Sequence, residues 1–72
     1  MKITYDPKSD AIYIKLNDHE IAKTKSAVEN KANIDLTAEG VIVGIELLWV
    51  SDYIDHPDQA EFIKYDVLLN PP

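Results

Sequence analysis

The sequence predicts a small α+β domain, in which an antiparallel β-sheet of about four to five strands is followed by a C-terminal helix. Three observations predict this class. Short segments of alternating apolar and polar residues fill the first two thirds of the chain, and this period is typical of half-buried strands. Turn-forming residues separate those segments at close intervals, as in hairpins. A proline then opens the C-terminal third, where it suits the first turn of a helix.

The N-terminal residues predict a β-hairpin over 2–16. In residues 11–16 (AIYIKL), apolar residues that face inward alternate with residues that face outward, and a shorter apolar segment precedes them. The loop between the two segments contains a proline, with Asp6 and Asp10 at its ends. Aspartate side chains bond backbone groups in turns, so both residues are predicted to shape this turn and to fix how the two strands meet.

The middle of the chain predicts an edge strand and a second hairpin. Residues 17–20 are polar and predict a simple turn, after which residues 21–28 (IAKTKSAV) carry lysines that would protect the open backbone of an edge strand. A second hairpin is predicted over 32–48, with Gly40 supplying a positive φ in its turn. Residues 41–48 (VIVGIELL) are apolar on both faces, which predicts a central strand.

The C-terminal third allows two structures. Pro57 and the acidic residues after it predict a helix that begins near residue 56, and Phe62 would contribute to its apolar stripe. Residues 63–69 also alternate, however, so a final strand is possible as well. The alternative fold class is therefore all-β, with a final C-terminal strand.

The composition describes one small domain, over residues 1–72, with little core of its own. A chain of 72 residues buries only about 60% of its unfolded surface, and without cysteine no disulfide can reinforce it. We therefore expect a homodimer or a complex with another protein. No apolar run reaches the ~20 residues of a membrane span, and the N-terminus lacks the pattern of a signal peptide, so we expect a cytoplasmic protein.

The charge balance favours a protein partner over nucleic acid. The chain has 7 lysines, no arginine and 13 acidic residues, for a net charge of −6. Nucleic-acid affinity comes mainly from lysine and arginine contacts to phosphate, so direct nucleic-acid binding is not expected. Opposite potentials raise the rate of encounter between proteins, so the acidic chain suits a basic protein partner.

Three motifs follow one another in a recognisable order. They are Tyr5-Asp6-Pro7-x-x-Asp10-Ala11-x-Tyr13-Ile14, then Asn33-Ile34-Asp35-Leu36, then GVIVGIELL from Gly40 through Gly44 to residue 48. Together, over about residues 2–50, they resemble the short prokaryotic proteins catalogued as the domain of unknown function numbered 2283. The resemblance implies no enzymatic activity, cofactor or catalytic residue. It implies an antitoxin-like role for some of its members, because proteins of similar sequence are often encoded beside small toxin-like proteins.

No pattern of residues predicts an enzyme, a cofactor or a metal site. The two histidines lack the spacing of zinc ligands, no serine lies in a nucleophile-elbow motif, and no glycine-rich phosphate loop is present. The first loop offers only Asp6 and Asp10 around a proline, fewer ligands than a calcium loop needs.

Four residues are candidates for contact with a partner. A carboxylate at position 46, inside an apolar strand, is either functional or pairs across the sheet with Lys15 or Lys23. Aromatic residues near the end of the sheet belong to the types enriched in interface hot spots. The candidate partner-binding residues are Glu46, Trp49, Tyr53 and Phe62.

The sequence thus favours a non-enzymatic protein-binding module, in its most concrete form an antitoxin-like neutraliser of a small basic protein. The alternative is a homodimeric domain that binds a small ligand or a metal between its turns.

Overall fold

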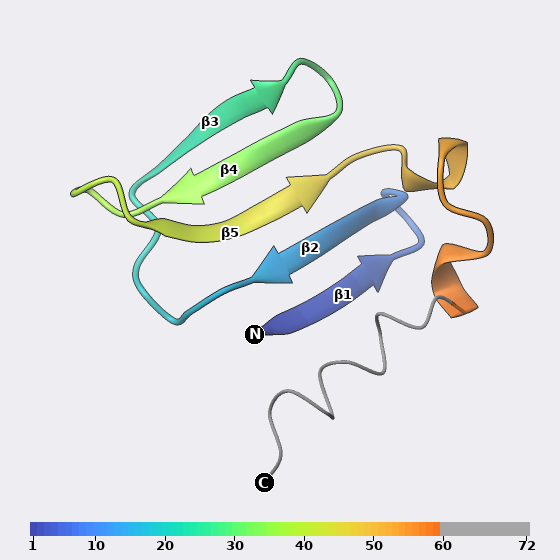
Figure 1. The fold of residues 1–72 in the computed structure, drawn as a ribbon, viewed down its shortest axis with the longest axis horizontal. Helices are drawn as coiled ribbons and strands as arrows, with labels where there is room; N and C mark the ends of the chain where they lie inside the picture. Colours follow the sequence, from blue (N-terminus) through green and yellow to red (C-terminus); the bar gives the residue numbers. More distant parts are fainter. Residues whose placement is uncertain (60–72) are drawn as a thin grey trace, which may run out of the picture.

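Residues 1–59 form a single antiparallel sheet of five strands (Figure 1) in the order β1-β2-β5-β4-β3. The structure is a computed structural model, and it describes residues 1–59. Its elements are β1 (Lys2–Asp6), β2 (Ala11–Lys15), β3 (Lys23–Val28), β4 (Ala32–Leu36), β5 (Ile42–Leu47) and two 3₁₀ turns, η1 (Val50–Asp52) and η2 (Pro57–Gln59).

The strand predictions are confirmed. The hairpin predicted over 2–16 is the β1–β2 pair, and the hairpin predicted over 32–48 is the β4–β5 pair. The lysine-containing segment forms β3 at one edge of the sheet, and the segment with two apolar faces forms β5 at its centre. Gly40 has a φ of 91° in the β4–β5 turn, which is the positive φ that the sequence predicted there.

One face of the sheet, which we call the apolar face, carries two rows of side chains across the strands. The register places Ile3, Ile14, Ile45, Ile34 and Lys25 in the first row and Tyr5, Ile12, Leu47, Ala32 and Val28 in the second. The four isoleucines of the first row are all half-buried, although β-branched side chains of this kind are usually core residues. This face therefore resembles one half of a core.

The opposite, polar face also has two rows. The first contains Lys2, Lys15, Gly44, Asp35 and Thr24, and the second contains Thr4, Tyr13, Glu46, Asn33 and Ser26. In these rows the side-chain alternation of β1, β2, β4 and β5 thus separates apolar from polar residues, as expected for a sheet that packs with one face only.

Very little of this sheet is buried. The buried apolar residues are Ala11, Ile12, Val43 and Val50, and the molecule measures 35 × 35 × 16 Å along its principal axes. Stacked sheets alone lie about 10 Å apart, so the short axis leaves room for little more than one sheet with its side chains. Residues 1–59 form no second layer of secondary structure, whereas stable domains usually pack two.

The predicted C-terminal helix is wrong, and the fold is mainly β. Where the helix was expected to begin, His56 has a φ of 52°, a left-handed backbone conformation that no right-handed helix continues. Pro57 instead begins the three-residue turn η2, and residues 1–59 contain no α-helix. The alternative final strand, over 63–69, and Phe62 lie outside the described residues.

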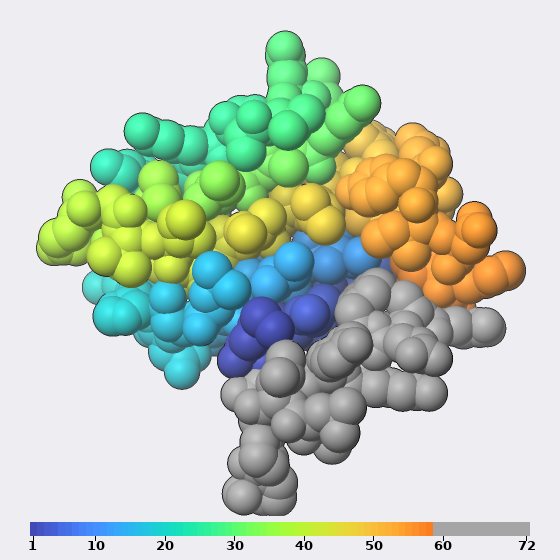
Figure 2. Space-filling model, viewed as in Figure 1, coloured from blue at the N-terminus to red at the C-terminus, as the bar shows by residue number. Residues whose placement is uncertain are grey.

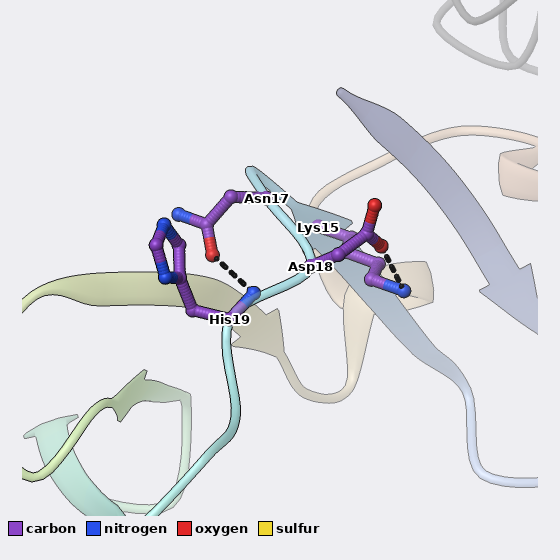
Figure 3. A network of polar contacts seen from close by, with 4 residues as sticks. All are labelled: Lys15, Asn17, Asp18 and His19. Carbon is purple, nitrogen blue, oxygen red and sulfur yellow. Dashed lines mark hydrogen bonds and ion pairs between the residues drawn. The ribbon is translucent and has the colours of Figure 1, made fainter.

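The polar segment predicted as a simple turn is instead part of a longer crossover from β2 to β3. This connection passes the ends of β5 and β4 (Figure 1) before it enters the edge strand. Asn17 holds it in place, because its Nδ2 donates to the carbonyl of Ile42 (2.9 Å) and its Oδ1 accepts from the backbone N–H of His19 (3.1 Å). Figure 3 shows the contact between Asn17 and His19 beside the ion pair between Lys15 and Asp18 (2.9 Å).

Candidate functional site

The first loop of the chain is shaped by Asp6. Its carboxylate accepts hydrogen bonds from the backbone N–H of Lys8 (2.9 Å) and from the hydroxyl of Ser9 (3.0 Å). Both contacts lie within the turn, so the predicted turn-forming role of Asp6 is confirmed. Within the described part of the chain, no three metal-ligating side chains gather, here or elsewhere.

Asp10 joins this loop to η1, a contact that the sequence did not predict. Its carboxylate accepts from the Ser51 hydroxyl (2.6 Å), from the Ser51 backbone N–H (3.2 Å) and from the Tyr5 hydroxyl (3.0 Å). Its backbone carbonyl also accepts from the N–H of Val50 (3.0 Å). Asp10 has a φ of 53°, which aspartate tolerates better than most residues. It therefore fixes the segment after β5 against the β1–β2 turn.

These contacts change the acidity of both side chains. The hydrogen bond from the Ser51 hydroxyl is the main reason that the pKa of Asp10 lies below its ordinary value, with a smaller contribution from Tyr5. The pKa of Tyr5 is raised, first by loss of solvent and then by its hydrogen bond to Asp10.

Tyr13 connects three strands on the polar face. Its hydroxyl donates to Asp35 on β4 (2.7 Å), and Asp35 also accepts from the hydroxyl of Thr24 on β3 (2.5 Å). The ring lies over Gly44 of β5, where the absence of a side chain leaves room for it. Loss of solvent, followed by the hydrogen bond to Asp35, raises the pKa of Tyr13 to about 12. Tyr13 of the first motif and Gly44 of the third thus form one structural unit, which we call the Tyr13–Gly44 unit.

Glu46 lies on this polar face and accepts a hydrogen bond from Asn33 (3.1 Å). The predicted alternative of an ion pair with Lys15 or Lys23 is wrong. Lys15 forms its ion pair with Asp18. Lys23 lies opposite Leu36, so its side chain is on the other face of the sheet from Glu46. Glu46 is half-buried beside Tyr13, and its contacts are those of a strand-to-strand link.

Trp49 and Tyr53 come together at the end of the sheet. With 58% and 55% of their surfaces exposed, they help to line a surface cleft of about 390 Å³ that we call the aromatic cleft. Its lining consists of Asn30, Lys31, Leu48, Trp49, Asp52 and Tyr53. Figure 2 shows the segment after β5, coloured orange, at the surface at this end of the molecule.

Hydrogen bonds join the residues that line the cleft. The N–H of Leu48 donates to the carbonyl of Lys31 (2.7 Å), which joins the β3–β4 turn to the end of β5. The Tyr53 hydroxyl donates to the carbonyl of Leu48 (3.2 Å), and the N–H of Asp52 donates to the carbonyl of Trp49 (3.0 Å). Trp49 is thus held between fixed neighbours, while the adjacent Val50 is fully buried.

Trp49 also has a φ of 53°. A left-handed backbone costs a residue with a side chain about 1–2 kcal/mol, and for a bulky side chain it is rare. Backbone strain of this kind clusters at functional sites. The left-handed backbone at Trp49 therefore lowers the stability of the fold, while the aromatic side chain is exposed to solvent.

The chain can now be compared with known families. The family model described as "Protein of unknown function (DUF2283)" matches residues 2–51. The chain belongs to the DUF2283 family. Neither a curated protein nor a solved structure matches it.

The DUF2283 match separates the two regions just described. It includes the whole sheet, the Tyr13–Gly44 unit and Asp10 with its partner Ser51, where the match ends. Two residues of the aromatic cleft, Asp52 and Tyr53, follow the matched segment. The Tyr13–Gly44 unit therefore lies within the segment that matches DUF2283, whereas Asp52 and Tyr53 of the cleft lie after it.

The sequence located part of this site. It singled out Trp49 and Tyr53, which the structure brings together, and Glu46, which lies elsewhere on the polar face. It missed Lys31 and Asp52, and the only signal for Lys31 was its place in a turn beside the end of the central strand. No helix within residues 1–59 has the length and apolar character to cross a membrane.

Proposed function

We propose that this DUF2283 protein is a non-enzymatic, protein-binding module that docks a basic protein through the apolar face of its sheet. The observation that carries the proposal is the half-buried row of four isoleucines across β1, β2, β5 and β4. A sheet with one apolar face gains about 25 cal/mol for each Å² of apolar surface that a second layer removes from water. A protein partner supplies that layer.

The charge of the chain supports a basic partner. The net charge is −6, and residues 48–58, which follow β5, contain three aspartates and no lysine. This arrangement would steer a positively charged protein to one end of the sheet and align it for contact with the apolar face. The most concrete form of the proposal is an antitoxin-like neutraliser in the cytoplasm that covers the basic surface of a small toxin.

The polar face supports a structural role for its carboxylates. Asp35 accepts hydrogen bonds from Tyr13 and Thr24, and Glu46 accepts one from Asn33. These contacts link neighbouring strands, so the carboxylates stabilise the sheet that presents the apolar face.

Co-expression with the product of the neighbouring gene tests the proposal. We expect a stoichiometric complex on gel filtration and relief of any growth defect that the neighbour causes on its own. Ile34→Glu, which puts a charge in the isoleucine row, should reduce complex formation at least tenfold. The matched control is Ser26→Glu on the polar face, which adds the same charge at an exposed position and should leave the complex intact.

Circular dichroism of both variants checks that they fold. A neighbour that is neither toxic nor bound would overturn the proposal, as would a chain that only dimerises through this face. Light scattering of the isolated protein distinguishes that second outcome, because the mass of a dimer would depend on Ile34 in the absence of any other protein.

A further inference from the structure

The aromatic cleft has the chemistry of a site for a cation. Trp49 and Tyr53 both line it, each has more than half of its surface exposed to solvent, and the faces of aromatic rings carry negative charge density. Asp52 lines the same cleft, and its carboxylate has no hydrogen-bond or ion-pair partner among residues 1–59. Two aromatic side chains and a free carboxylate therefore belong to one cleft.

The surroundings increase this preference. The charges of Asp10 and Asp52 act on the Tyr53 hydroxyl and, after loss of solvent, are the causes that raise its pKa. Two further aspartates, Asp55 and Asp58, follow in the same exposed segment. The potential at this end of the sheet is thus negative, in keeping with the −6 charge of the whole chain.

Arginine fits this arrangement better than lysine. Its planar guanidinium stacks on aromatic rings and presents a fork of donors to a carboxylate, whereas the lysine ammonium is a strongly hydrated point charge. The volume of about 390 Å³ is at the low end of the range for ligand pockets, which suits one long side chain. We propose that the aromatic cleft receives an arginine side chain of the basic protein partner, an inference that rests on the proposed function above.

In this arrangement the guanidinium stacks on Trp49 and donates to the carboxylate of Asp52, while Tyr53 forms the other wall. Lys31 also lines the cleft, and its backbone is held by the hydrogen bond from the Leu48 N–H to its carbonyl. Its ammonium repels an incoming cation. The effect of removing that charge therefore has opposite signs for a cationic and an anionic ligand.

Titration with peptides tests the proposal on the full chain. Trp49 is the single tryptophan, so its fluorescence reports directly on the cleft. The probes are a capped Gly-Arg repeat hexapeptide and the Gly-Lys hexapeptide of equal charge. We expect saturable quenching by the arginine peptide and an affinity about two- to fivefold higher than that of the lysine peptide.

Three variants and a control sharpen the test. Asp52→Asn should weaken binding of the arginine peptide about two- to fivefold, and Lys31→Gln should strengthen it. Trp49→Ala, followed through the anisotropy of a labelled peptide, should abolish saturable binding. Glu39→Gln removes the same charge as Asp52→Asn from an exposed position in the β4–β5 turn and should have no effect.

Equal affinity for the two peptides would overturn the proposal, as would equal losses for Asp52→Asn and Glu39→Gln. Weaker binding after Lys31→Gln would mean that the cleft prefers an anion. The partner complex separates the two proposals. If Ile34→Glu abolishes it and Trp49→Ala leaves its affinity unchanged, the arginine site is refuted and the docking face stands. If no partner complex forms but the arginine peptide binds as expected, the docking face is refuted and the cleft stands.

Discussion

The ring of Tyr13 on β2 lies over Gly44 on β5, and its hydroxyl reaches past that strand to bond Asp35 on β4 at 2.7 Å. A Cβ at position 44 would overlap both the hydroxyl and the ring. Gly44 is therefore required because the Tyr13 ring approaches its backbone closely. Gly40, by contrast, is required for its positive φ. The pair explains why a glycine lies in the centre of the strongest strand.

Gly44→Ala should accordingly destabilise the protein by about 1–3 kcal/mol, the usual cost of overpacking. The added methyl group displaces the Tyr13 ring and breaks the hydrogen bond to Asp35. Urea unfolding followed by circular dichroism measures the loss. In a Tyr13→Ala background the same substitution should cost much less, because the ring that it displaces is gone. An equal cost in both backgrounds would show that the glycine serves another purpose.

Stability should fall at alkaline pH because of Tyr13. Its pKa is raised from 10.0 to about 12 by loss of solvent and by the hydrogen bond to Asp35, so the folded state favours the protonated phenol. The contribution of Tyr13 is thus complete below about pH 10 and is lost as the pH rises from about 10 to 12. Tyr13→Phe cannot ionise, so its stability should change less over this range. Parallel slopes for the two proteins in urea unfolding would contradict the assignment.

The link between Asp10 and Ser51 should weaken in acid. Because the Ser51 hydroxyl lowers the pKa of Asp10, the link contributes fully above the ordinary aspartate value of 3.8 and is lost as the pH falls below it. Ser51→Ala should therefore lower the urea midpoint at pH 7, and the difference from the parent protein should shrink toward pH 3. Ser9→Ala, which removes a hydroxyl bonded to Asp6 within the turn, is the control and should show a smaller loss at pH 7.

The strands were predictable because their alternation is a local property. In β1, β2, β4 and β5 apolar residues recur at every second position, β3 is marked by its lysines instead, and the turns between the strands contain proline, asparagine or glycine. The three-residue turns η1 and η2 are too short for any periodic signal. The polarity of the segment after β2 predicts a simple turn, because a local pattern carries no information about the order of the strands in the sheet.

The site was predictable only in part, for a similar reason. The residue type identified Trp49 and Tyr53 as candidates, but their meeting depends on Val50 being buried and on Asp10 holding Ser51. These contacts join residues about 40 positions apart in the sequence. A sequence pattern shows which side chains are chemically suited to a partner, whereas the sheet order decides which of them share a surface.

Substitution of Trp49 should separate the backbone strain of the cleft from its binding. Both Trp49→Gly and Trp49→Ala remove the aromatic side chain, but only glycine adopts a φ of 53° without cost. The glycine variant should therefore be the more stable of the two by about 1 kcal/mol, measured by urea unfolding with circular dichroism.

The matched control is the pair Val41→Gly and Val41→Ala, at an exposed position without a positive φ, where glycine should be the less stable variant. If alanine were also the more stable residue at position 49, the left-handed conformation would not be a source of strain. Both variants at position 49 should lose the arginine peptide. A glycine variant that is stable yet unable to bind would show that the strained tryptophan is retained for its contact with a partner, since the fold itself does not need it.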